Sequence, residues 1–276
     1  MEIFSNSSAQ VVMISTTVLL IVLMVTLAIR ERRISKARFL EGLIWLQKLR
    51  NILSLVQQHR GLSNGYVCGD HSLSLRILPL QTQINLQRMA LSNHGTWIAN
   101  NPDWAAIQEH WQRLSTGFEK LDSNNNLEQH SKLISSILYL IDDCAEQHQL
   151  YEVKDQDQRS IRYLWQDLLV TAENVGQARA IGTGVAATGR CTSVNRIRLS
   201  YLHQAISNVS QQNHDVRNAA LNNLLDLLTQ KVIVDSPSVS ANDYFDVATL
   251  ALEEVLVRFD ETLAELKQLI ASKSFI

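Results

Sequence analysis

The chain has 276 residues, of which 46% are hydrophobic and 19% are charged, and it contains only 10 glycines and 3 prolines. So few residues that interrupt helices predict an all-helical protein. The formal net charge of −2 excludes a general electrostatic attraction to nucleic acid.

The segment 11–29 contains no charged residue. As a helix it would be about 28 Å long, close to the thickness of about 30 Å of the hydrocarbon core of a bilayer. We predict that it is a transmembrane helix that follows a short tail, residues 1–10. A cleaved signal peptide is the alternative, but residues 1–10 lack the lysine or arginine that such a peptide carries before its apolar core.

Five basic residues follow the apolar segment, and none precedes it. They lie in the juxtamembrane segment 30–39 and are Arg30, Arg32, Arg33, Lys36 and Arg38. Basic residues beside a membrane helix are typical of its cytoplasmic side. We therefore expect a single-pass protein of the bacterial inner membrane, with its N-terminus outside and residues 30–276 in the cytoplasm.

Residues 40–272 are expected to form one domain of about eight helices, before a tail at 273–276. Apolar residues recur at steps of three and four in the first helical segment, 35–61. Further helical segments are expected at 73–93, 102–121 and 127–150. Asn101 is the expected N-cap of the third segment, with Pro102 in its first turn, and 123–126 is expected to be a loop. These four helices could close one bundle.

A second set of helices begins near Asp155. Its first helix carries an apolar stripe from Leu164 to Thr183 and is expected to end at Gly189. Small residues along it are expected to let a neighbouring helix approach closely: Gly176, Ala180, Gly184 and Ala187. Ser193 is the expected cap of the next helix, whose apolar side is predicted to hold Val194, Ile197, Arg198, Tyr201, Ala205 and Val209. Further helices are expected at 214–233 and 242–272.

Three arginines lie on these apolar stripes, where leucine or alanine is expected: Arg60, Arg179 and Arg198. A buried guanidinium is costly unless a negative group meets it. Glu173 is the only acidic residue near Arg179 in the sequence, and no acidic residue follows Arg60 before Asp70. A bound small anion is therefore one interpretation. An internal ion pair, or extension of the side chain to the surface, is the alternative.

Two hydroxyl residues follow the first two arginines by about one turn of helix. Ser63 follows Arg60, and Thr183 follows Arg179. They are expected to add hydrogen-bond donors on the same faces, with capping or helix packing as the alternative role.

Three segments resemble the nitrate- and nitrite-sensing (NIT) domain family. They are QQHRGLSNGY around Arg60, ENVGQARAIGTGVAATGR around Arg179, and YFDVATLALEEV near the C-terminus. The resemblance covers about residues 40–272. It implies an all-helical domain of two four-helix bundles, in which arginines from both halves respond to nitrate or nitrite.

The resemblance also implies roles for particular residues. Arg60 falls in the first-helix motif, where characterised members have two adjacent arginines, and this chain has His59 before Arg60. A neutral histidine would donate one hydrogen bond without a full charge. Arg179 matches the fifth-helix arginine. A further family arginine corresponds to Arg198 by its position on the stripe, with Arg196 and Arg217 as the alternatives.

Other patterns that carry chemistry are missing from the sequence. It has no HExxH or EF-hand pattern, and GTGVAATG lies within a predicted helix with no strand before it. The acidic pairs Asp142–Asp143 and Glu253–Glu254 are expected to lie on solvated helix faces. The three cysteines are far apart and are expected to be small buried residues: Cys68, Cys144 and Cys191.

We therefore predict a membrane-anchored sensor that is not an enzyme and uses no cofactor or metal. Nitrate is planar with three acceptor oxygens, which suits the planar guanidinium groups of arginine. Signalling is expected to go through a conformational change to a separate protein partner or through a homo-oligomer. The alternative is a membrane-anchored helical scaffold that binds no ligand.

Overall fold

The computed structural model describes residues 2–212 and 218–272, with side chains described for 11–209 and 218–272. Across these ranges the regular elements are helices, and the single strand-like contact there is an isolated antiparallel bridge between Lys154 and Ser160. The prediction of an all-helical protein is confirmed.

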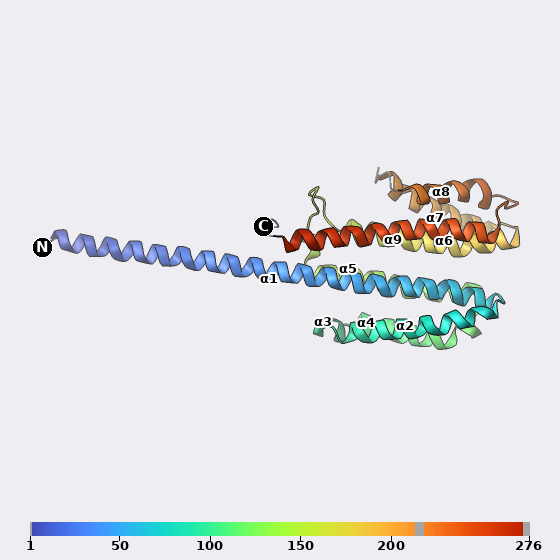
Figure 1. Cartoon of the computed structure of the whole chain (residues 1–276), viewed down its shortest axis with the longest axis horizontal. Coiled ribbons are helices and arrows are strands. Elements are labelled where there is room, and N and C mark those ends of the chain that lie inside the picture. The colour runs from blue at the N-terminus through green and yellow to red at the C-terminus, as the bar shows by residue number, and fades with distance from the viewer. Residues whose placement is uncertain (1, 213–217, 273–276) are drawn as a thin grey trace.

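One continuous helix, α1 (Glu2–Val67), has 66 residues and is about 100 Å long. The sequence had predicted a short tail, a membrane helix and a separate first domain helix. They merge because lysine and arginine favour helices and no proline precedes Pro79. The N-terminal half of α1 projects beyond the other helices (Figure 1). Within the described residues it is the one helix long and apolar enough to span a membrane.

The remaining helices follow in chain order. The α-helices are α2 (Ser74–Ser92), α3 (Thr96–Ala99), α4 (Pro102–Gly117), α5 (Ser123–Gln147), α6 (Leu169–Thr188), α7 (Ser193–Gln212), α8 (Ala219–Leu227) and α9 (Ala241–Ala271). The 3₁₀ turns are η1 (His71–Leu73), η2 (Phe118–Lys120) and η3 (Leu150–Glu152), and the π-helical turns are η4 (Leu164–Leu168) and η5 (Leu228–Val232). Short α3 and the π-helical turns were not predicted.

Side-chain caps decide several helix starts. Asn101 caps α4 as predicted, because its Oδ1 accepts the N–H groups of residues 103 and 104. The predicted loop at 123–126 is wrong, since the side chain of Asp122 accepts the N–H of Asn125 and α5 begins at Ser123. The hydroxyl of Thr192, one residue before the predicted cap, accepts the N–H of Asn195 at the start of α7.

The helices lie along α1 in two groups. On one side of α1 and α5 lie α2 and α4, and on the other lie α6 to α9 (Figure 1). The C-terminal end of α9 is held to α1, because Nζ of Lys36 donates to the carbonyl of Ala271 at 2.8 Å. An ion pair of 2.7 Å between Arg50 and Asp260 joins the same two helices further along.

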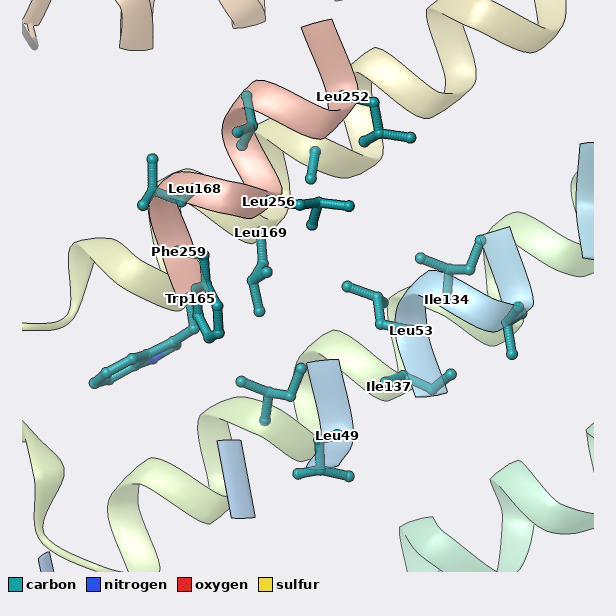
Figure 2. Packing of buried hydrophobic residues seen from close by; sticks show 14 of the residues in the cluster. Leu49, Leu53, Ile134, Ile137, Trp165, Leu168, Leu169, Leu252, Leu256 and Phe259 are labelled. Atoms are coloured by element: carbon teal, nitrogen blue, oxygen red, sulfur yellow. The ribbon is translucent and has the colours of Figure 1, made fainter. Parts of the chain in front are cut away.

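One hydrophobic core connects the two groups. Figure 2 shows buried residues of both groups close together, with Leu53 of α1 and Ile137 of α5 on one side and Trp165 and Phe259 on the other. All of these side chains are buried. The core thereby places the last turns of α1 beside α6, where the arginines meet.

The predicted apolar side of α7 is wrong. Val194, Ile197 and Tyr201 are 58%, 71% and 70% exposed, whereas Leu199 and Leu202 are buried. Apolar residues occur on both sides of this helix, so their spacing alone did not select the buried side. Arg198 shares the exposed side.

Two further predictions about single residues are corrected. Cys144 and Cys191 are buried as expected, but Cys68 is exposed. Asp142 and Glu254 are hydrogen-bonded within the fold rather than only solvated. The carboxylate of Glu254 accepts the N–H groups of Ala220 and Leu221 at the start of α8, where it stabilises the helix N-terminus.

Candidate functional site

A cavity of about 640 Å³ lies where the last turns of α1 meet α5, α6, α7 and α9. Four arginines line it: Arg60, Arg179, Arg190 and Arg198. No aspartate or glutamate of the described chain is among its lining residues. A smaller cavity of about 280 Å³ adjoins it and shares Arg60 and Arg198, and the exposed side chain of Glu128 lines that smaller cavity.

The small residues of α6 form one wall of the larger cavity. Gly176, Ala180, Gly184 and Ala187 all line it. A Cβ added to Gly184 would meet nothing within 4 Å, so this part of the helix faces open space. The expected close approach of a neighbouring helix occurs at Gly176, which lies against the Arg60 side chain of α1, whereas Gly184 faces the cavity.

Arg60 enters the cavity wall from α1 and is 2% exposed. Its Nη1 donates to Oε1 of Glu173 at 2.6 Å, and its Nη2 donates to Oε2 at 3.2 Å. Nη1 also donates to the hydroxyl of Ser131 at 3.1 Å. For Arg60, the structure therefore shows the internal ion pair that the sequence left as an alternative.

Two amides hold the Glu173 carboxylate from either side. Nε2 of Gln57 donates to Oε2 at 2.9 Å, and Nε2 of Gln177 donates to Oε1 at 2.8 Å. Together with the two bonds from Arg60, each carboxylate oxygen accepts two hydrogen bonds. Full pairing of this kind is what allows a carboxylate to stay buried.

Arg179 is in a different situation. Its Nη1 donates to the hydroxyl of Thr249 at 3.1 Å, and its Cζ lies 5.0 Å from the ring centre of Phe245. Among the described residues, no carboxylate is within ion-pair distance of it. Burial, and then repulsion by Arg60, lower the pKa of Arg179 to about 10, although the charges of Glu253 and Glu173 oppose this shift. The guanidinium therefore remains charged at neutral pH.

Further polar groups complete the cavity wall. Thr183 lines the cavity, and its Oγ1 is buried without a hydrogen-bond partner in the described chain. Arg190 and Arg198 lie on the exposed part of the lining. Arg190 was not predicted as a site residue. It follows Gly189, whose left-handed backbone (φ 62°) ends α6 as predicted.

His59 and Ser63 do not line the cavity. Successive helix residues are about 100° apart, so the side chain of His59 points well away from that of Arg60, and Ser63 lies on the same side as His59. Nδ1 of His59 lies 2.8 Å from Nε2 of His130, and the hydroxyl of Ser63 accepts from Nδ2 of Asn126 at 3.1 Å. Both side chains bond to α5 instead.

The two alternatives to Arg198 do not join the site either. Arg196 forms an ion pair of 2.5 Å with Asp235 and donates to the carbonyl of Ile233. Arg217 lies outside the described residues. Of the predicted site residues, the structure thus brings Arg60, Arg179, Arg198 and Thr183 together around one cavity.

The neutral partners of these arginines were missed by sequence reasoning. Gln57, Gln177, Thr249 and Phe245 carry no charge and follow no recognisable spacing. Helical periodicity could have found the first two, because Gln57 precedes Arg60 by one turn and Gln177 follows Glu173 by one turn.

The cavity presents positive charge and hydroxyl donors, and its lining suits a small anion with several acceptor oxygens. No group of three or more His, Cys, Asp or Glu residues in the described ranges is placed to hold a metal ion. No family model, curated protein or solved structure matches this chain.

Proposed function

We propose that this chain is a membrane-anchored sensor that binds nitrate or nitrite in the cavity beside Arg179. The observation that carries the proposal is that Arg60 is paired with Glu173, whereas Arg179 has no carboxylate within ion-pair distance among the described residues and is attracted by Glu253 and Glu173 only from further away. A partly buried positive charge without a counter-ion is costly. A bound monoanion would supply that counter-ion.

The shape and donors of the site support a planar oxyanion. The Arg179 guanidinium can meet two oxygens side by side, and the unpaired hydroxyl of Thr183 one turn later adds a donor. The resemblance of the segments around Arg60 and Arg179 to the NIT domain family favours nitrate or nitrite among such anions. In that family's terms, α1, α2, α4 and α5 would be one four-helix bundle and α6 to α9 the other.

The binding test is calorimetry on the full chain in lipid nanodiscs with nitrate, nitrite, chloride and sulfate. Nitrate or nitrite should bind, and at about 100 times the dissociation constant should raise the free energy of unfolding by about 2.7 kcal/mol. Arg179→Ala should abolish binding. Arg113→Ala is the matched control, because Arg113 is a largely exposed arginine on α4 that does not line the cavity.

The ion pair of Arg60 with Glu173 favours one other function, a membrane-anchored helical scaffold that binds no ligand. In a scaffold, the buried arginine needs only its internal partner. If none of the four anions binds to the wild-type chain, or if Arg179→Ala leaves binding unchanged, the sensor proposal is wrong and the scaffold is favoured.

The proposed topology places residues 11–29 across the inner membrane and the helices after it in the cytoplasm, with signalling to a separate protein partner or through a homo-oligomer. Exposed Cys68 can report on this placement. A membrane-impermeant maleimide should leave Cys68 unlabelled in intact spheroplasts and label it after permeabilisation. Labelling of Cys68 in intact spheroplasts would show the opposite orientation.

A further inference from the structure

The carboxylate of Glu173 already occupies the position at Arg60 that an incoming anion would take. It is 4% exposed and meets both terminal nitrogens of the Arg60 guanidinium. Nitrate and a carboxylate are both planar, and both can place two oxygens side by side against such a fork. The two anions therefore compete for the same two donors.

The groups around Glu173 can hold its carboxylate when Arg60 is taken away. Gln57 and Gln177 donate to different oxygens of this carboxylate, and neither bond involves Arg60. Exchange of Arg60 from Glu173 to a ligand therefore leaves the carboxylate with two neutral donors. This lowers the cost of opening the ion pair.

We propose that Glu173 sets the affinity of the site by competing with the bound anion for Arg60. The inference rests on the proposed function, since it needs an anion that reaches Arg179. The ligand pairs first with Arg179, which has no carboxylate partner, and then draws Arg60 from Glu173. Arg60 is on α1 and Glu173 is on α6, so this exchange opens an ion pair between the two groups of helices.

The direct test is nitrate calorimetry on full-length Glu173→Gln in nanodiscs. The substitution keeps the size of the side chain and removes the competing charge, so the affinity for nitrate should rise about tenfold or more. Glu128→Gln is the matched control. It removes one negative charge at the adjoining cavity, but Glu128 is exposed and is paired with Lys132 rather than Arg60. Screening by water should keep its effect within about threefold.

The outcomes separate this inference from the proposed function. Wild-type binding with no gain in Glu173→Gln overturns the inference and leaves the function standing. Binding by Glu173→Gln alone supports the inference and shows that the wild-type chain is not a nitrate sensor. Absence of nitrate binding in both overturns the inference, and absence of nitrite binding as well overturns the proposed function.

A second variant covers the case in which Glu173→Gln fails to fold. Glu173→Asp keeps the charge but shortens the side chain, which moves the carboxylate back from Arg60. Its nitrate affinity should lie between those of the wild type and Glu173→Gln. Affinity equal to or below that of the wild type in a folded Glu173→Asp chain also overturns the inference.

Discussion

Gly176 of α6 lies directly against the guanidinium of Arg60 from α1: a Cβ at position 176 would come within 2.6 Å of Nη2 of Arg60. A side chain at this position would require the guanidinium of Arg60, which is held by Glu173, to shift. Gly176→Ala should therefore push the guanidinium out of its ion pair. The cost of overpacking, about 1–3 kcal/mol, should exceed the gain of about 1 kcal/mol in helix propensity. Urea unfolding should show a net loss of stability.

Gly184→Ala is the matched control for this change. Gly184 lies on the same helix and lines the same cavity, but a Cβ there would meet nothing within 4 Å. Alanine should leave stability unchanged or raise it by up to about 1 kcal/mol. Equal effects of the two substitutions would show that Arg60 does not depend on the space at Gly176.

The two central arginines should differ in what they contribute to stability. Arg60→Met leaves the buried carboxylate of Glu173 without its cation, and breaking a buried pair costs about 3–5 kcal/mol. Arg179→Met removes a charge that has no carboxylate partner, so it should cost little or increase stability in an anion-free buffer. Denaturant unfolding of both variants measures the difference, and similar losses would mean that Arg179 has a stabilising partner.

The sequence predicted most helices because their signals are local. Asn101 before Pro102 starts α4, and Gly189 ends α6 as expected. The partner of Arg60 could not be predicted in this way, because Glu173 is 113 residues further along the chain and only packing brings the two together. An arginine on an apolar stripe predicts a buried charge. The stripe does not predict which residue neutralises that charge.

The position of His59 was predicted wrongly from the sequence. Family resemblance and sequence adjacency put His59 beside Arg60 in the site, yet the side chain belongs to the contact between α1 and α5. Adjacent helix residues point about 100° apart, so one of two neighbours faces a different partner. Whether a residue lines the cavity depends on the helix face that it occupies, and not on which residue is next to it in the sequence.

His59 and His130 form a buried pair whose hydrogen bonds fit two neutral rings. Nδ1 of His130 donates to the carbonyl of Asn126 at 2.7 Å, so its Nε2 accepts from Nδ1 of His59. Nε2 of His59 in turn accepts from the amide of Gln81 at 3.0 Å. Burial lowers the pKa of His59 from 6.5 to about 4 and holds the pKa of His130 well below 6.5.

This pair should make the protein less stable in mild acid. Between pH 6.5 and about 4 the unfolded chain binds protons that the folded rings do not, so stability falls as the pH is lowered. The slope should be about 1.4 kcal/mol per pH unit for each ring. His59→Gln should reduce the slope measured by urea unfolding, while the control His71→Gln, at an exposed histidine, should not. A slope unaffected by His59→Gln would contradict the neutral pair.

Asp142 and Asp143 are adjacent on α5 but should respond oppositely to loss of charge. Oδ1 of Asp142 accepts from the hydroxyl of Tyr151 at 2.6 Å, the indole of Trp165 at 2.8 Å and the amide of Gln166 at 3.1 Å. Burial opposes the charge of Asp142, but these bonds outweigh it and lower the pKa. Burial and neighbouring carboxylates, Asp103 first among them, instead raise the pKa of Asp143.

Asp142→Asn should therefore lower the free energy of unfolding at pH 7 by about 1–2 kcal/mol, because three bonds to a charged acceptor become bonds to a neutral one. The loss should shrink below pH 3.8, where the wild-type carboxylate of the unfolded chain is itself protonated. Asp143→Asn should leave stability unchanged or raise it slightly, since it relieves repulsion at an exposed position. Chemical denaturation of the two variants side by side checks this, and an equal loss in both would mean that Asp142 does not organise the chain between α5 and α6.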